Sequence, residues 1–439
     1  MIDILKEILL DFQEMPLVTG VPRRLALTPV AGKASVCIGV RRGGKSTYMF
    51  QRMERLLASG VPRQNILYLN FFDDRLHGLR SETMGLIAEA YYSLFPEKKN
   101  SETIYCFFDE IQAIPGWEPF VERLMRTEKC EVYITGSSAH MLSREIATQM
   151  RGRALSWEMF PFSFREFLDW QGLDGSMPFS SKNRLLVQKA FAAFWESGGF
   201  PEVAGLDRRL RIKTHQEYFH AVLFRDLVER YDISHPRAII DLAHRLVDNT
   251  ASLYSINSLT GYLQSLGHKA PKAAVSEYLA WFEDAYFLFT VRIFDASLAR
   301  ANTNPKKIYC IDHALVTSVA SGVLVNSGHL LENLVFTALR RVTPDICYVK
   351  TRSGREVDFT ARLEDGSRLL AQVCDSMADP LTRKREIASL AEAMAEYKLA
   401  SGIIVTRGEE GRIEVEAGKI AIVPAWRFLL DLEQEGQGV

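Results

Sequence analysis

A single loop between a predicted strand and a predicted helix constrains this chain more than any other feature. Residues 39–46 read Gly-Val-Arg-Arg-Gly-Gly-Lys-Ser and match the pattern GxxxxGK[ST]. The apolar run before the loop predicts a buried strand, and the stretch after it predicts a helix. Glycines let backbone N–H groups wrap around phosphate oxygens, and the start of the helix adds a positive dipole end. The sequence therefore predicts a phosphate-binding loop.

The residue types in this loop indicate a nucleotide with a metal ion. Lys45 is expected to contact the β- and γ-phosphates, and Ser46 is expected to ligate Mg²⁺. The other predicted nucleotide contacts are Gly39, Arg42, Gly43, Gly44 and Thr47. The expected cofactors are therefore ATP and Mg²⁺.

A second apolar run, "TIYCFFDEIQ", ends in two adjacent acids, Asp109 and Glu110. Asp109 at the end of the strand is expected to hold the metal ion, and Glu110 to orient and polarise the attacking water. The alternative is that the two acids only cap the next helix. Together with the phosphate loop upstream, the pair predicts ATP hydrolysis.

A third apolar run, "CEVYITGSSAH", leads into a polar turn. Ser137 is the predicted sensor of the γ-phosphate and Ser138 is the close alternative, although "TGSS" is also an ordinary turn. Further along, Arg151 and Arg153 flank a glycine. In a ring of subunits such an arginine can reach the neighbour's γ-phosphate, and the alternative is that both are surface charges.

Short β-rich runs alternate with helical stretches from about residue 30 to 160, which predicts an α/β fold with a parallel sheet. The pattern is mainly helical from about 162 to 250, and strands and helices mix again after about 300. The chain has 439 residues, six scattered cysteines and a net charge of −1. We expect a soluble, cytoplasmic, multidomain protein without a membrane span, in which any polyanion meets a local basic patch.

Several motifs occur in an order that resembles a known family: "GVRRGGKST", "FFDEIQAIPGW", "ITGSSAHMLSREIATQMRGR", "FPFSFREFL", "GGFPEV", "LFRDLVERY", "KIYCIDHALV", "GHLLENLVF" and "REVDF". The chain resembles bacterial and archaeal AAA+ ATPases that carry a C-terminal restriction-endonuclease-like domain of the PD-(D/E)XK type. The resemblance implies an AAA+ core at 1–161, a helical lid at 162–248, a winged-helix element at 249–300 and a nuclease-like domain at 301–439. It also implies a ring of subunits, with a hexamer as one option, and supports the roles assigned above to Lys45, Asp109, Glu110, Ser137 and the segment 151–153.

Residues 256–294 predict a helix–turn–helix followed by a β-wing, with helices at about 256–266 and 271–282. Lys269 and Lys272 stand at the start of the second helix, where phosphate contact is natural. Further basic clusters are Arg208, Arg209, Arg211 and Lys213, then Arg383 to Arg385, and Lys306 with Lys307. Such clusters are usually solvated faces, and the helix pair could equally be a packing module.

The last region raises the question of nuclease chemistry. The resemblance places an acid at Glu332 on a helix and another at Asp358 on a strand, with Glu356 on the same face. The expected Glu-x-Lys strand is replaced by Gln372-Val373-Cys374. An amide is a poor ligand for a hard divalent ion and a thiol has no cationic role. Asp375 should point to the opposite face, and nothing positions Lys384. We predict a degenerate nuclease site.

These observations lead to one leading hypothesis and two others. The leading hypothesis is an oligomeric AAA+ ATPase that binds or remodels nucleic acid, DNA above all, with the degenerate nuclease-like domain as scaffold. The rival is an ATP-gated switch that acts on a protein partner in a defence or regulatory module, which the near-neutral charge and the apolar second helix favour. The third is an ATP-dependent nuclease.

Overall fold

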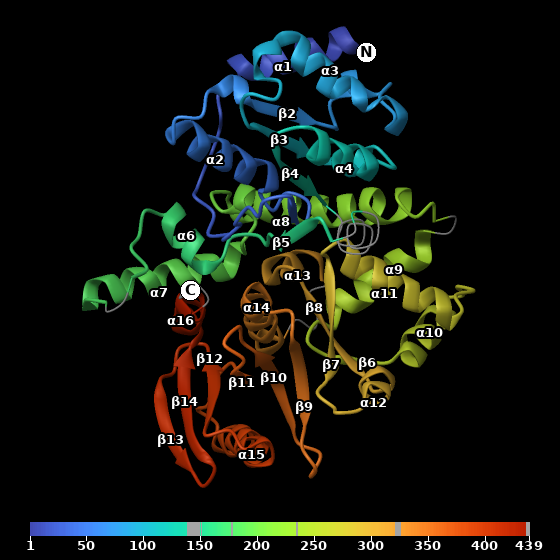
Figure 1. Cartoon of the computed structure of the whole chain (residues 1–439). Helices are drawn as coiled ribbons and strands as arrows, with labels where there is room; N and C mark the ends of the chain where they lie inside the picture. The colour runs from blue at the N-terminus through green and yellow to red at the C-terminus, as the bar shows by residue number, and fades with distance from the viewer. Residues whose placement is uncertain (138–149, 151, 177–178, 234–235, 321–325, 436–439) are drawn as a thin grey trace. The chain divides into compact units, whose positions relative to one another are not determined.

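The structure, a computed structural model, describes the chain except residues 138–149, 151, 177–178, 234–235, 321–325 and 436–439. The chain divides into two compact units (Figure 1). The first comprises residues 1–160 with 284–286, and the second comprises residues 161–283 with 287–439. Each unit has its own β-sheet, and each is described separately below.

The first unit is built on a parallel sheet of five strands in the order β2-β3-β4-β1-β5. Its strands are β1 (Ala34–Ile38), β2 (Ile66–Asn70), β3 (Ile104–Asp109), β4 (Cys130–Gly136) and β5 (Ala154–Glu158). Its α-helices are α1 (Ile2–Glu14), α2 (Lys45–Ala58), α3 (Gly85–Leu94) and α4 (Glu118–Thr127). The parallel α/β fold predicted from the alternating runs is confirmed.

The interior of this unit explains why the strands read as apolar runs. All five side chains of β1 are buried, and in β3 only Tyr105 is partly exposed. A parallel sheet is covered by helices on both faces, so its central strands lose the alternation of apolar and polar residues. Phe107 and Tyr133 stack at 4.6 Å between neighbouring strands β3 and β4.

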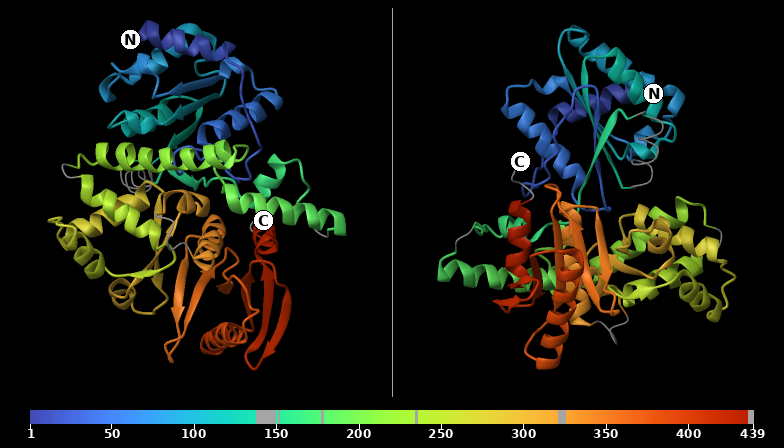
Figure 2. Two further views of the ribbon diagram at one scale, coloured as in Figure 1. Left: turned by 180° about the vertical axis from the view of Figure 1, so that it is seen from behind. Right: turned by 60° about the horizontal axis from the view of Figure 1, so that its bottom comes forward.

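The second unit begins with helices and ends with a mixed sheet. Its helices are α6 (Phe164–Trp170), α7 (Ser181–Ser197), α8 (Arg208–Ala221), α9 (Pro236–Asp248), α10 (Ile256–Ser265), α11 (Lys272–Asp284), α12 (Leu298–Thr303), α13 (His313–Val319), α14 (Ser327–Val342), α15 (Pro380–Tyr397) and α16 (Ala425–Glu435). A π-helical segment, Val222–Glu229, directly continues α8 (Figure 2). Among the described helices of both units, none is long and apolar enough to cross a membrane.

The sheet of the second unit has nine strands in the order β13-β14-β12-β11-β10-β9-β7-β8-β6. These are β6 (Leu253–Tyr254), β7 (Leu288–Ile293), β8 (Lys306–Cys310), β9 (Ile346–Lys350), β10 (Glu356–Arg362), β11 (Arg368–Cys374), β12 (Ser401–Thr406), β13 (Gly411–Val415) and β14 (Gly418–Pro424). In Figure 1 the sheet runs from the red strands β13 and β14 to the gold strands β7, β8 and β6.

The two helices predicted around the turn at Gly267 are confirmed as α10 and α11. The strand predicted as a β-wing behaves differently. β7 lies inside the large sheet, antiparallel to β8 and parallel to β9. The sheet therefore continues across the boundary predicted at residue 300, because β7 precedes that residue and pairs with β8 and β9, which follow it.

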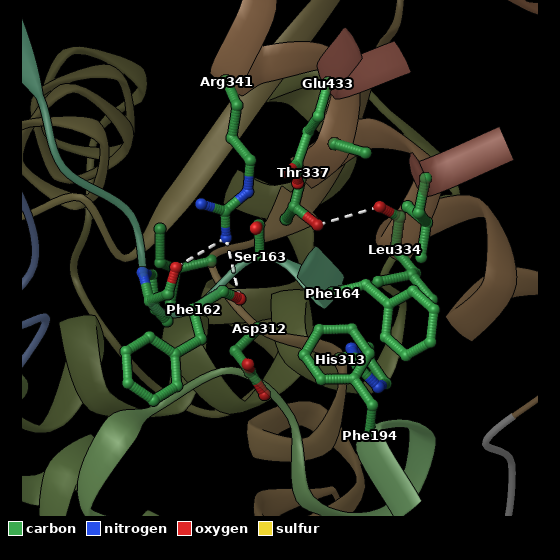
Figure 3. A pocket seen from close by; sticks show the side chains of 14 residues that line it. Phe162, Ser163, Phe164, Phe194, Asp312, His313, Leu334, Thr337, Arg341 and Glu433 are labelled. Carbon is green, nitrogen blue, oxygen red and sulfur yellow. Dashed lines mark hydrogen bonds between the residues drawn. The ribbon is translucent and has the colours of Figure 1, made fainter. Parts of the chain in front are cut away.

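A buried cluster joins the first helices of the second unit to α13 and α14 (Figure 3). It surrounds a cavity of about 20 Å³. The Arg341 guanidinium donates to the carbonyl oxygens of Pro161 and Phe162 at 2.7 and 3.1 Å. Asp312 caps α13 by accepting from two backbone N–H groups, and its other oxygen accepts from the N–H of Gly199 at 2.7 Å. Asp312 thus ties the Gly198-Gly199 break to the sheet.

Replacing Asp312 with alanine is expected to lower the free energy of unfolding by about 2–4 kcal/mol, because buried N–H groups on two segments lose their acceptor. Chemical denaturation measures the change. The control is Asp207→Ala, which removes the cap of α8 from two exposed N–H groups and should cost about 1 kcal/mol. Equal losses in the two variants would contradict the role given to Asp312.

Candidate functional site

The predicted phosphate loop lies between β1 and α2, where the sequence pattern placed it. Gly44 is the residue before the helix, with a left-handed φ of 97°. A side chain at Gly39 would come within 2.0 Å of the Met159 carbonyl oxygen, so only glycine fits there. α2 begins at Lys45, so the N–H groups of Lys45, Ser46 and Thr47 form the first turn of the helix. Such N–H groups have no partner within the helix and bind anions.

Lys45 has an ammonium group that the loop itself holds in place. Its Nζ donates to the carbonyl oxygens of Gly39 and Val40, each at 3.0 Å, and lies 3.7 Å from a carboxylate oxygen of Glu110. The side chain is 4% exposed. Lys45 and Glu110 come from different strand ends, so the structure brings together the two residues expected to carry the chemistry.

Asp109 is fully buried at the end of β3, and three side chains surround its carboxylate. Thr135 on β4 donates to Oδ1, and Tyr68 on β2 donates to Oδ2 at 3.2 Å. Burial raises the pKa of Asp109, and the hydrogen bonds from Thr135 and Ser46 oppose that rise. The contact with Ser46 joins the two predicted metal ligands. Sequence reasoning missed Thr135 and Tyr68, although each lies on a strand next to β3.

Glu110 is held in a left-handed conformation with a φ of 55°, directly after the strand. Its N–H donates to the Thr135 hydroxyl at 3.0 Å, and its carboxylate accepts from the side-chain amide of Gln112. The same amide lies 3.5 Å from the hydroxyl of Ser137, the predicted sensor. Gln112 therefore links Glu110 to Ser137, a role that the sequence analysis did not assign.

The arginines near this site have different positions. Arg23, which the sequence analysis did not single out, is buried and donates to the carbonyl oxygens of Gly43 and Phe160, both at 2.6 Å. Arg23 thereby links the phosphate loop to the segment that follows β5. Arg153 pairs with Glu122 on α4 at 3.2 Å and is 47% exposed. Arg151 and Ser138 lie outside the described residues.

Comparison with known proteins agrees with this geometry. Residues 31–168 match the family model described as an AAA domain, and residues 188–323 match a domain of unknown function (DUF8612). The chain is 32% identical over 437 residues to the uncharacterized protein MJ1544 of Methanocaldococcus jannaschii, covering 97% of this chain and 95% of that one. The chain belongs to the family of MJ1544. An uncharacterized protein of Haemophilus influenzae is 30% identical over 332 residues, with coverage of 75% and 80%.

Solved structures give weaker similarities. The Walker-type ATPase PABY2304 of Pyrococcus abyssi matches with a TM-score of 0.41 and 14% identity, over 65% of this chain and 90% of that chain. The ORC1 protein of Aeropyrum pernix, solved in complex with DNA, matches with a TM-score of 0.31 and 13% identity, over 65% and 86%. The AAA domain and the loop geometry identify this member of the MJ1544 family as an AAA-type P-loop ATPase that binds ATP.

The second unit holds a separate cluster of acids, and it centres on a residue that the sequence analysis placed among surface charges. Lys307 on β8 is 3% exposed. Its Nζ lies 2.8 Å from Glu332, 2.8 Å from Asp358 and 2.7 Å from Glu356. Tyr309, two residues along the same strand, donates to Glu332 at 2.6 Å. The expectation of a solvated face is wrong for Lys307, because β8 is an interior strand of the sheet.

The charged groups in this cluster shift one another's pKa values. Burial acts to lower the pKa of Lys307, but the carboxylate of Asp358, together with Tyr309, Glu332 and Glu356, outweighs it and raises that pKa. Burial and the Asp358 carboxylate raise the pKa of Glu332 to about 8, against the opposing effect of Lys307. Burial is the larger cause of this rise because the Glu332 side chain is only 9% exposed.

A bulge in β10 directs Asp358 toward Lys307. The register with β9 shifts between Val357 and Thr360, and bulges of this kind re-aim side chains. The backbone N–H of Asp358 donates to the amide oxygen of Gln372 at 3.2 Å, and its Oδ2 accepts from the N–H of Val373 at 2.9 Å. Here the side chains of Asp358 and Gln372 form the hydrogen bonds between β10 and β11 that backbone groups form elsewhere along these strands.

Gln372 and Cys374 share a face, as predicted from their spacing, but that face is packed against α15. The Gln372 amide donates to Glu386 at 2.7 Å, and Cys374 belongs to an apolar cluster with Leu390 and Met394. Gln372 therefore has a structural role in hydrogen bonding that the sequence analysis missed. It donates to Glu386 and accepts from Asp358 at once, which a carboxylate could not do.

The basic residues proposed to contact nucleic acid occupy helix starts in the second unit. Arg208 and Arg209 lie exposed in the first turn of α8, and Arg211 pairs with Glu196 at 3.3 Å. Lys272 begins α11, and Lys269 precedes it in the turn; both are exposed. All five residues therefore lie on or beside the first turns of helices.

Replacing Gln372 with glutamate would restore the missing acid of a Glu-x-Lys strand, and we expect it to destabilise the protein. The new carboxylate would face Glu386 in a buried place, at a cost of about 2–4 kcal/mol at pH 8. The pKa of the introduced carboxyl group in the folded state would rise above its usual value of about 4.3, so the penalty should fade as the pH drops toward that value. Denaturant unfolding at pH 8 and pH 5 tests this, with the exposed Gln264→Glu as control. A loss that is the same at both pH values would contradict it.

Proposed function

We propose that this protein is an oligomeric AAA+ ATPase that couples hydrolysis of Mg-ATP to the binding or remodelling of nucleic acid, DNA above all. The observation that carries the ATPase part is the meeting of Lys45 with Glu110 beside the buried Asp109, at the end of a parallel sheet. Nucleotides bind at the carboxyl ends of parallel strands in folds of this kind.

The loop fits ATP and a magnesium ion. The N–H groups at the start of α2 and the Lys45 ammonium would hold the phosphates, and Ser46 and Asp109 would hold the metal ion, which neutralises charge on the phosphate oxygens. Glu110 would orient a water for attack, and the side-chain amide of Gln112 contacts both the Glu110 carboxylate and the Ser137 hydroxyl. Ser137 is our choice for the group that senses the γ-phosphate.

The assembly part of the proposal is a ring in which an arginine completes the neighbouring subunit's site. Arg153 is the candidate within the described residues, since its guanidinium is about half exposed and its partner Glu122 lies on the surface helix α4. Exposed ion pairs are worth little, so Arg153 can leave Glu122 for a phosphate at small cost.

The nucleic-acid part rests on the exposed cations of the second unit. Lys269 and Lys272 stand at the start of the second helix of a helix–turn–helix, and Arg208 with Arg209 form another exposed pair. These positions suit phosphate contacts without base reading. The order α14-β9-β10-β11-α15-β12, with its acids on α14 and β10, supports a nuclease-like domain that serves as scaffold.

The second candidate function is an ATP-gated switch for a protein partner. Its support is the surface of α11, where the exposed positions after Lys272 include Ala273, Ser276, Glu277 and Ala280. This face has few groups that can read base edges and carries an acid that phosphates would repel. A protein partner suits it better than a DNA groove does.

Replacing Glu110 with glutamine should lower the turnover of ATP by about 10²- to 10⁴-fold, because the amide cannot polarise the attacking water. Nucleotide binding should persist, since Lys45 and the loop are unchanged. Steady-state phosphate release and binding of a fluorescent ATP analogue measure the two effects. The exposed Glu89→Gln on α3 is the matched control. Unchanged turnover in Glu110→Gln would remove Glu110 from its role.

The choice between nucleic acid and protein is made by one assay series. ATPase rates are measured without polymer and with single-stranded, duplex and branched DNA and RNA, at low and moderate salt. We expect stimulation that salt weakens, and a reduced effect in Lys269→Glu/Lys272→Glu. The exposed pair Lys182→Glu/Arg184→Glu on α7 serves as control. If no polymer binds or stimulates hydrolysis, the nucleic-acid proposal fails and the protein-partner proposal stands.

A further inference from the structure

The acid cluster of the second unit has the outline of a divalent-metal site. Glu332 projects from α14, and Glu356 and Asp358 project from β10, so that one oxygen of each carboxylate converges on a single point. Carboxylates arranged in this way hold Mg²⁺ or Mn²⁺ in enzymes that cleave phosphodiesters. Among the residues that the structure describes, however, no group of acids, histidines and cysteines is set to hold a metal ion.

The reason is that the point of convergence is already filled. The Lys307 ammonium has three N–H donors, and three carboxylate oxygens lie 2.7–2.8 Å from its nitrogen. A bound Mg²⁺ would need the same oxygens at about 2.1 Å from its own centre. The ammonium and the metal ion therefore cannot occupy this place together.

Further protein donors hold two of these carboxylates in place. Oδ2 of Asp358 accepts from the N–H of Val373 at 2.9 Å, and Oε1 of Glu332 accepts from the Tyr309 hydroxyl at 2.6 Å as well as from Lys307. The Tyr309 ring is fixed in turn by stacking on Phe336 at 4.4 Å. The Lys307 backbone cannot shift away from the carboxylates, because it belongs to strand β8, which is paired with β7 on one side and β6 on the other.

We propose that Lys307 is a built-in counter-ion that takes the place of a divalent metal ion, so that this domain keeps the nuclease-like arrangement without metal binding or cleavage. The inference goes beyond the proposed function, because it holds whether the partner is nucleic acid or protein. It also explains why the strand at 372–374 can hold Gln and Cys: with the cation supplied by β8, no further ligand or lysine is required there.

The test is Mn²⁺ binding to the full-length, nucleotide-free protein, measured by electron paramagnetic resonance and by equilibrium dialysis. Lys307→Met removes the ammonium at nearly constant volume, and we expect it to bind one Mn²⁺ more than the wild type. Adding Asp358→Asn should abolish that extra ion. The control is Lys306→Met, whose side chain alternates to the other face of β8 and should gain no ion.

Removal of the counter-ion from the buried Glu332 and Asp358 and the partly exposed Glu356 strains the fold. A second variant, Lys307→Met/Glu332→Gln, therefore keeps two acids with less charge and should still gain the ion. Either variant, when folded, overturns the proposal if it gains no Mn²⁺. Two results with the wild type would also contradict the proposal. One is Mn²⁺ binding that Asp358→Asn abolishes, and the other is cleavage of labelled DNA that Asp358→Ala abolishes. ATPase activity, measured alongside, reports separately on the proposed function.

Discussion

Parallel strand pairing is the constraint on which the nucleotide site depends. Ile38 lies beside Gly136 and Phe108 beside Ile134, so β1, β3 and β4 end at nearly the same level of the sheet. The residues that follow these ends are far apart in sequence and yet form one site. The buried Asp109 is held by hydroxyls from β2 and β4 on either side, so the register of the sheet sets the position of the carboxylate before any nucleotide binds.

Lys45 and Lys307 are both buried, and their different partners suit them to different functions. Lys45 donates to two backbone carbonyl oxygens, which are neutral, and stands 3.7 Å from one carboxylate. A phosphate can displace such partners with a net gain in charge pairing. Lys307 is saturated by three carboxylates, so no anion improves on what it already has. Lys45 is therefore suited to binding a ligand and Lys307 to replacing one.

The sequence predicted the local elements well and the long-range contacts poorly. The loop at 39–46, the strand ending in Asp109 and the helices α10 and α11 each carry their signal within about fifteen residues. Lys307 carries no such signal: its sequence context is a basic pair, and only the strand order of the sheet shows that it is buried. Gln112, Arg23 and Thr135 were missed for the same reason, since their partners are set by the fold and not by spacing.

The departure at 372–374 gains a physical explanation once the sheet is known. A lysine two residues after an acid on β11 would stand at Cys374, in the apolar cluster against α15, where burial of an ammonium carries a desolvation cost. The acid itself would face Glu386. Since the Lys307 ammonium on β8 already lies among the three acids, we expect an acid and a lysine on β11 to destabilise the domain without adding a needed charge. Under the proposal for Lys307, the absence of a Glu-x-Lys pattern on β11 and the lysine on β8 are two parts of one electrostatic arrangement, in which the cation comes from a different strand of the same sheet.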